Sequence, residues 1–208
     1  MKPLALAILS SCAMFSTEPY AATRDMSLYV TIDSGASGTH VSGQLSAPVE
    51  IDLGPNDSLA VALDGATLFS KRALAFELDA PARSGDFGFA LHHEGDHDVA
   101  LDVTLVPASN IQATSASGKL LLDWTPFPDA GAPTITVTGT CIEPQTIVTQ
   151  TDTGHYEILA AQLQLLPAPC PIALGLSRKL QTAIPFMGKA FLIATVSQTE
   201  SGTGTWTP

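Results

Sequence analysis

Short runs with apolar side chains at alternate positions, separated by glycine and proline, recur along the chain from residue 27 onward. In the first run, residues 27–33, the side chains of Leu28, Val30 and Ile32 share one face. A period of two is that of half-buried β-strands, and glycine and proline end such strands. The pattern therefore predicts an all-β protein with an antiparallel Ig-like or β-sandwich fold. Further strands are expected at 49–53, 59–63, 74–78, 120–124, 135–137, 147–149, 172–174 and 191–195.

The strongest supersecondary signal is a pair of alternating runs, 87–91 and 99–105. The polar turn residues Glu94, Gly95 and Asp96 lie between them. This arrangement predicts a β-hairpin. It resembles hairpins that are common in bacterial Ig-like domains.

Two domain organisations fit the strand pattern. Residues 24–112 and 115–208 each contain enough strands for a β-sandwich, which predicts two tandem domains divided near residues 109–117. The alternative is one large sandwich of nearly the whole chain. One stretch, residues 155–166, fits both a strand and a short helix, and its neighbours favour the strand.

The N-terminus has the layout of a secretory signal peptide, with Lys2 followed by an apolar stretch from Leu4 to Phe15. We expect cleavage near Ala22, so that residues 1–22 are removed. A competing interpretation is that the residues up to Cys12 resemble a lipobox, which would make Cys12 the lipidated first residue. Both interpretations of the N-terminus predict export to the periplasm, outer membrane or surface of a bacterium. Membrane attachment is expected only if Cys12 is lipidated.

Two cysteines, Cys141 and Cys170, follow the signal segment. In an oxidising compartment a lone pair of cysteines forms a structural disulfide, and neither has further metal ligands at matching spacing. The net charge of −11 disfavours phosphate backbones, so we expect no nucleic-acid partner.

Residues 92–98 hold three histidines and three carboxylates. Imidazole and carboxylate groups bind metal ions, and His92, His97 and Asp98 are the candidate ligands. The preferred interpretation is a polar, soluble hairpin tip without metal.

The chain contains no Gly-x-Ser-x-Gly elbow and no glycine-rich phosphate loop. We therefore expect no enzyme, no catalytic residue and no cofactor. Two tryptophans and an aromatic content of 6% likewise give no sign of a carbohydrate platform.

The export signal, the scarcity of lysine and the alternating segment with Leu28, Val30 and Ile32 together resemble the subunits of bacterial surface fibres, the fimbrial or pilin-like proteins. In that family an alternating N-terminal segment completes the sandwich of a neighbouring subunit by strand addition. The resemblance implies that these three residues belong to a donor strand. The chain departs from the family in its C-terminal disulfide and in residues 202–206, which lack the usual aromatic-terminated last strand. The alternative is that residues 27–33 form the first strand of their own domain.

These features favour an exported, non-enzymatic structural or adhesive cell-surface protein with protein partners or self-association. The alternative is a periplasmic or outer-membrane binding module, a lipoprotein if Cys12 is lipidated, with metal binding at the hairpin tip as a variant. A secreted hydrolase ranks last.

Overall fold

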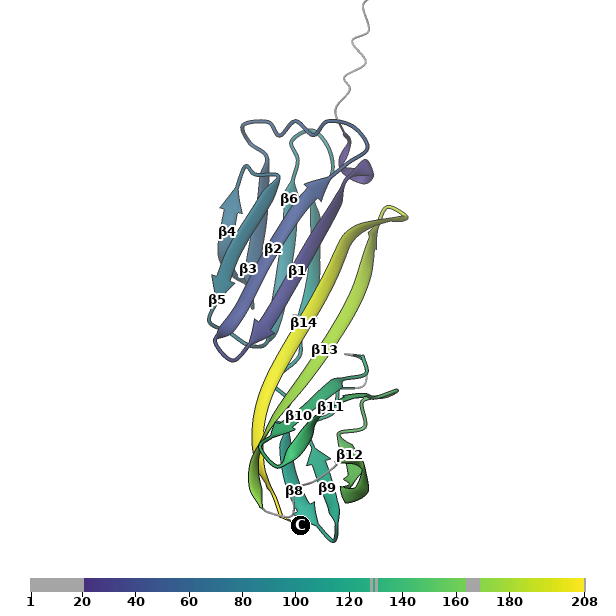
Figure 1. Cartoon of the computed structure of the whole chain (residues 1–208). Coiled ribbons are helices and arrows are strands. Elements are labelled where there is room, and N and C mark those ends of the chain that lie inside the picture. The colour runs from purple at the N-terminus through teal and green to yellow at the C-terminus, as the bar shows by residue number, and fades with distance from the viewer. Residues whose placement is uncertain (1–20, 128, 130, 164–168, 208) are drawn as a thin grey trace, which may run out of the picture.

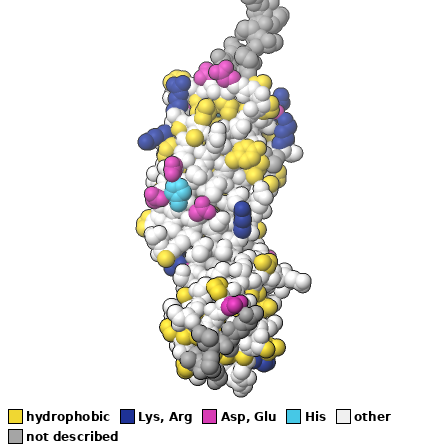
Figure 2. Space-filling view, in the orientation of Figure 1, with side chains coloured by type: hydrophobic (Ala, Val, Ile, Leu, Met, Phe, Trp, Pro, Cys, Tyr) yellow, Lys and Arg dark blue, Asp and Glu magenta, His cyan; other side chains and the backbone are white. Residues whose placement is uncertain are grey.

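The computed structural model describes residues 21–127, 129, 131–163 and 169–207. Cys12 and most of the signal segment lie outside them. The described residues are almost entirely β-structure, arranged in two sheets and two lobes stacked end to end (Figures 1 and 2), which confirms the all-β sandwich class. In this part of the chain no helix is long and apolar enough to cross a membrane.

The larger sheet, here called sheet A, runs through both lobes. Its continuous path has the order β11-β10-β13-β14-β1-β2-β5. The bounds of these strands are β1 (Ser27–Gly35), β2 (Gly38–Ser46), β5 (Ala75–Ala80), β10 (Thr134–Gly139), β11 (Ile142–Val148), β13 (Cys170–Phe186) and β14 (Lys189–Trp206). Off this path, β8 (Gln112–Ala116) touches β14, and β9 (Lys119–Asp123) joins β8 to β12 (His155–Leu159).

The smaller sheet, sheet B, belongs to the first lobe and has the order β4-β3-β6-β7. Its strands are β3 (Ser58–Leu63), β4 (Ala66–Lys71), β6 (Gly85–His92) and β7 (Val99–Leu105). β6 and β7 form the hairpin expected from the alternating runs, and the positive φ of 80° at Gly95 suits its turn. The hairpin prediction is therefore confirmed.

Strand β1 lies inside its own sandwich. It pairs antiparallel with β2 and parallel with β14, so neither of its edges is free. Leu28, Val30 and Ile32 are buried in the core between sheets A and B. The structure thus corresponds to the first-strand interpretation, and a donor strand made of these residues would have to leave a central position with two paired edges.

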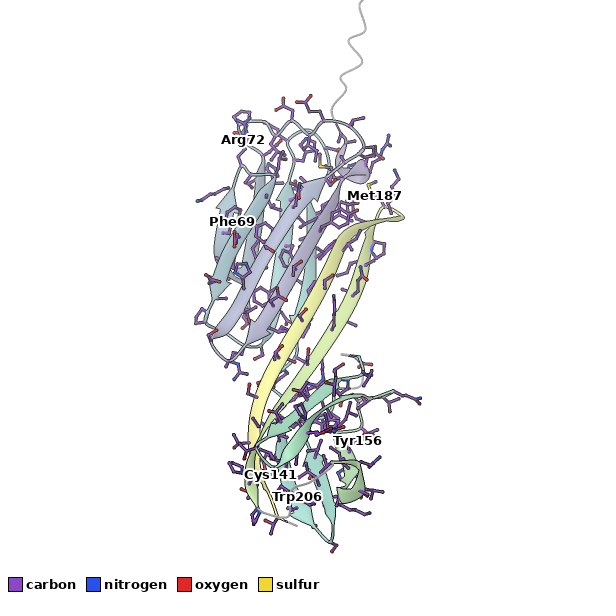
Figure 3. The ribbon with its side chains drawn as sticks, viewed as in Figure 1. Phe69, Arg72, Cys141, Tyr156, Met187 and Trp206 are labelled. Atoms are coloured by element: carbon purple, nitrogen blue, oxygen red, sulfur yellow. A yellow bond between two sulfur atoms is a disulfide. The ribbon has the colours of Figure 1, made fainter. Side chains whose placement is uncertain are left out.

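The second lobe has a core of its own. Apolar side chains from β9, β10 and the start of β13 fill it, together with Trp124 and Trp206. Cys141, in the turn after β10, is bonded to Cys170 at the start of β13, which confirms the disulfide expected from the sequence. Figure 3 shows Cys141 and Trp206 close together in this lower lobe.

The long hairpin β13–β14 contributes to both cores (Figure 1). Inward-facing residues of its lower half, such as Leu174 and Leu176, lie in the second core, whereas Leu192 and Ala194 of its upper half lie in the first. Apolar residues of 180–196, which fall within the predicted second domain (115–208), therefore pack with the first core. Alternation alone could not reveal this, since it identifies a strand but not its partners.

The ambiguous stretch 155–166 begins as a strand, β12, and continues after Leu159 as the 3-10 turn η3 (Ala160–Gln162). Residues 164–166 lie outside the described part of the chain. Within the described part of this stretch, the strand interpretation is correct for residues 155–159 and wrong for residues 160–162.

Replacing Cys141 with serine should lower the free energy of unfolding by roughly 3–4 kcal/mol, because the disulfide closes a loop of about 30 residues in the unfolded chain. For a protein of this size that corresponds to a fall of roughly 10 °C in the melting temperature. Calorimetry of the oxidised protein checks this. Dithiothreitol should lower the melting temperature of the wild type and leave that of Cys141→Ser unchanged; a wild type that does not respond to dithiothreitol would contradict the prediction.

Candidate functional site: the groove between β7 and β13

The two sheets of the first lobe are unequal in width. Five strands of sheet A lie in this lobe, β13, β14, β1, β2 and β5, against the four strands of sheet B. As a result the upper half of β13 extends past β7, the last strand of sheet B. In the described part of the chain, β7 pairs only with β6, and residues 178–186 of β13 pair only with β14. Both strands thus present an unpaired edge.

A groove of about 410 Å³ lies between these two edges. Its apolar wall on β13 consists of Leu180 and Ile184, with Thr182 between them, and β7 supplies Val103 and Leu105. These side chains lie there because every second residue of each strand points inward. The three β13 residues are only half-buried, since no strand of sheet B covers them.

The lower end of the groove is polar and buried. Arg178 enters the space between the lobes, where its Nε and Nη2 donate to Asp152 Oδ2 at 2.9 and 2.7 Å. Its Nη2 also donates to the backbone oxygen of Thr125 at 3.1 Å, and its Nη1 donates to Ser109 Oγ. Arg178 thereby connects β13 to the linker after β7 and to two loops of the second lobe.

Asp152 accepts two further hydrogen bonds besides those from Arg178. Trp124 Nε1 donates to its Oδ1 at 2.6 Å, and the Phe127 N–H donates to its Oδ2 at 2.9 Å. Burial alone would raise the pKa of Asp152, but these hydrogen bonds and Arg178 outweigh it and lower the pKa below its usual value. The carboxylate therefore stays charged at neutral pH.

Two residues of β14 extend this junction. Gln198, directly opposite Arg178, donates from Nε2 to the backbone oxygen of Val106 at 2.8 Å. Its Oε1 is buried and accepts no hydrogen bond from the described residues, although the side chain lines the groove. Glu200 forms an ion pair with Arg83, from the loop before β6. Together these contacts fix the two lobes to the same hairpin.

Beyond the apolar wall, the hairpin tip meets the turn between β6 and β7. The ring of Phe186 lies 6.5 Å from that of His97, measured between centroids. Lys189 forms an ion pair with Asp25 of the 3-10 turn η1 (Thr23–Asp25). Met187, at the exposed tip, is labelled in Figure 3.

The candidate metal ligands do not converge. His92 Nδ1 lies 2.7 Å from Asp98 Oδ1, and His97 Nδ1 lies 2.7 Å from Asp96 Oδ1, so they form two separate exposed pairs. Among the described residues no group of three or more histidine, cysteine, aspartate or glutamate side chains could hold a metal ion. His93, in contrast, points inward and contacts Thr23 Oγ1 at 3.0 Å.

Sequence reasoning missed the groove and the buried pair. A signal for the pair was present, because Arg178 continues the inward series of Leu174 and Leu176 and so places a charge at a core position. The sequence contains no comparable signal for the groove, because the groove exists only where the paired strands leave two edges free.

No protein-family model and no curated protein matches this chain. Several solved structures with β-sandwich domains do align with it. A segment of two fibronectin type-III domains from chicken tenascin aligns with 86% of this chain and 97% of its own length, at 13% identity and a TM-score of 0.35. The 47-kDa lipoprotein Tp47 of Treponema pallidum aligns with 85% of this chain and 51% of its own length, at 14% identity and a TM-score of 0.34.

A 1.5-MDa bacterial ice-binding adhesin also aligns, over 88% of this chain and 64% of the solved chain, at 13% identity and a TM-score of 0.26. At such identities and scores these similarities say nothing about activity. The assignment to the β-sandwich class rests on the sheets themselves.

Replacing Asp152 with asparagine should lower the free energy of unfolding by about 3–5 kcal/mol at pH 7, because it leaves the buried Arg178 guanidinium without its counter-charge. Asp123→Asn is the matched control. Asp123 is an exposed carboxylate paired with His155, so its loss should change stability by less than about 1 kcal/mol. Urea unfolding of both variants measures the difference.

The same pair predicts an acid dependence. The pKa of Asp152 is lowered in the folded state, so its contribution to stability is complete above the pKa of an unfolded carboxyl group and is lost as the pH falls through the lowered value. Wild-type stability should therefore fall more steeply than that of Asp152→Asn between about pH 5 and pH 2. Equal slopes for the two proteins would contradict a charged Asp152.

Proposed function

We propose that this chain is an exported, non-enzymatic structural or adhesive protein of the bacterial cell surface, comparable to a fimbrial subunit, which binds an extended segment of a different protein. The observation that carries the proposal is the unequal width of the two sheets, which leaves the edge of β7 unpaired beside the uncovered apolar face of β13. An envelope-bound form anchored through Cys12 would use the same groove.

An extended polypeptide is the ligand that fits this arrangement. An unpaired strand edge presents backbone N–H and C=O groups, which another strand satisfies by adding to the sheet. A strand added to β7 would become the fifth strand of sheet B, opposite β13. Its inward side chains would then cover Leu180, Thr182 and Ile184.

The groove also specifies the composition of its partner. The apolar side chains on β13 require apolar residues at alternate positions of the added strand. At the rim, Asp102 and the exposed Asp129 are acidic, while Arg178 is already neutralised by Asp152. Basic or neutral residues therefore suit the outward positions of the partner.

The donor is a different protein rather than a second copy. Within the described residues, the regularly alternating strands of this chain, such as β1, β6 and β7, already bury their apolar side chains in its own first core. A second copy could donate such a strand only by unfolding.

The groove is tested with a displayed library of random twelve-residue peptides, selected against the full chain. The enriched peptides should share apolar residues at alternate positions. Thr182→Glu, which places a charge in the groove, should weaken their binding at least tenfold. Ala183→Glu is the matched control, because Ala183 lies exposed on the opposite face of β13, and it should bind like the wild type.

Hydrogen exchange on the peptide complex should show new protection of the amides in β7. Peptides without alternation, or undiminished binding by Thr182→Glu, would overturn the proposed site. Self-association of the wild type that Thr182→Glu abolishes would contradict the assignment of a different protein as donor.

A further inference from the structure

The outer face of sheet A carries a second hollow, on the side of the hairpin opposite the groove. It measures about 440 Å³ and is lined by strands β1, β2, β5, β13 and β14. None of its lining residues is charged. Its polar members are Tyr29, Thr31, Ser42, Gln44, Gln181 and Thr195.

Strand register brings these residues together. Tyr29 of β1 lies opposite Gln44 of β2, and Thr31 lies opposite both Ser42 of β2 and Thr195 of β14. Gln181 of β13 is in turn opposite Thr195. Because Leu28 and Val30 point into the core, Tyr29 must point outward, and it is 49% exposed.

The polar groups of this hollow are unused. Within the described part of the chain, the six side chains make no hydrogen bond and no ion pair with other residues. The adjoining surface differs, because His40 there is paired with Asp79 at 2.8 Å and Glu77 at 3.3 Å. Figure 2, which views this face, shows acidic side chains around a histidine and uncharged side chains beside them.

We propose that this hollow, which we call the Tyr29 face, binds a neutral saccharide. The sugar ring would stack on Tyr29, since an exposed aromatic ring offers a flat apolar surface with a polar hydroxyl at its end. The two glutamine amides and the three aliphatic hydroxyls supply both donors and acceptors for sugar hydroxyls.

Other ligand classes fit this face less well. A charged ligand would find no counter-charge among the lining residues. An added peptide strand would find no free edge, because β1 is paired on both sides by β2 and β14. The Tyr29 face is therefore distinct from the groove in both chemistry and position.

Tryptophan, the residue that a sequence search for a sugar platform uses first, is not involved. Trp124 and Trp206 are both buried in the second lobe. The inference goes beyond the proposed binding of a protein strand and gives the adhesive role a chemical target.

The experiment probes an array of neutral oligosaccharides, built from hexoses and N-acetylhexosamines, with the full chain, followed by titration of the bound glycans in solution. Tyr29→Ala should weaken binding at least tenfold. Tyr29→Phe, which keeps the ring, should stay within about threefold of the wild type. Tyr156→Ala is the matched control, because Tyr156 is an exposed tyrosine of the other lobe (Figure 3), and it should not change the affinity.

Thr182→Glu should also bind glycans like the wild type, because it alters only the groove. A wild type that binds no neutral glycan overturns the inference, as does equal binding by wild type and Tyr29→Ala. Binding restricted to acidic glycans overturns the assignment of a neutral ligand. None of these outcomes bears on the peptide-binding groove, which is tested separately.

Discussion

The buried pair of Arg178 and Asp152 is the interaction on which the two-lobed arrangement depends. A guanidinium and a carboxylate removed from water are destabilising unless their remaining hydrogen-bonding groups are satisfied. Here Trp124 and the backbone N–H of Phe127 donate hydrogen bonds to the Asp152 carboxylate. The Arg178 guanidinium donates to Ser109 and to the backbone oxygen of Thr125. Ser109 comes from the linker after β7, and the other three partners come from the loop after β9. The pair is therefore stable only when the linker and the loops of the second lobe occupy their places against β13.

The position of that pair also determines what the hairpin can do. It fixes the middle of β13, so that the lower half completes the second core while the upper half extends past sheet B. One face of the upper half then forms the wall of the groove. The other face contributes Gln181 to the Tyr29 face. Alternation along a single strand thus separates two surfaces of different chemistry.

The sequence was sufficient for features that depend on local pattern. Period-two runs identified most of the strands and the β6–β7 hairpin, but the strand expected at 49–53 is irregular loop, and β2, β4 and β8 were not predicted. The presence of only two cysteines after the signal segment identified the disulfide. Features that depend on pairing between distant strands were not accessible. The parallel contact of β1 with β14 leaves no mark in either sequence, and the strand expected at 172–174 is part of a strand of 17 residues. Gly175 and the polar residues 177–179 interrupt the apolar pattern, so the sequence does not show the full length of β13.

The pairing of the first strand with the last has a consequence for the order of folding. Leu28 lies opposite Leu192, so β1 gains its neighbour β14 only after synthesis has passed residue 192. Contacts between such distant residues form slowly, because a long loop must close before they stabilise the structure. An incomplete chain would keep one edge of β1 open to pairing with other chains. The formation of the first sandwich therefore depends on the β13–β14 hairpin, which also joins the two lobes.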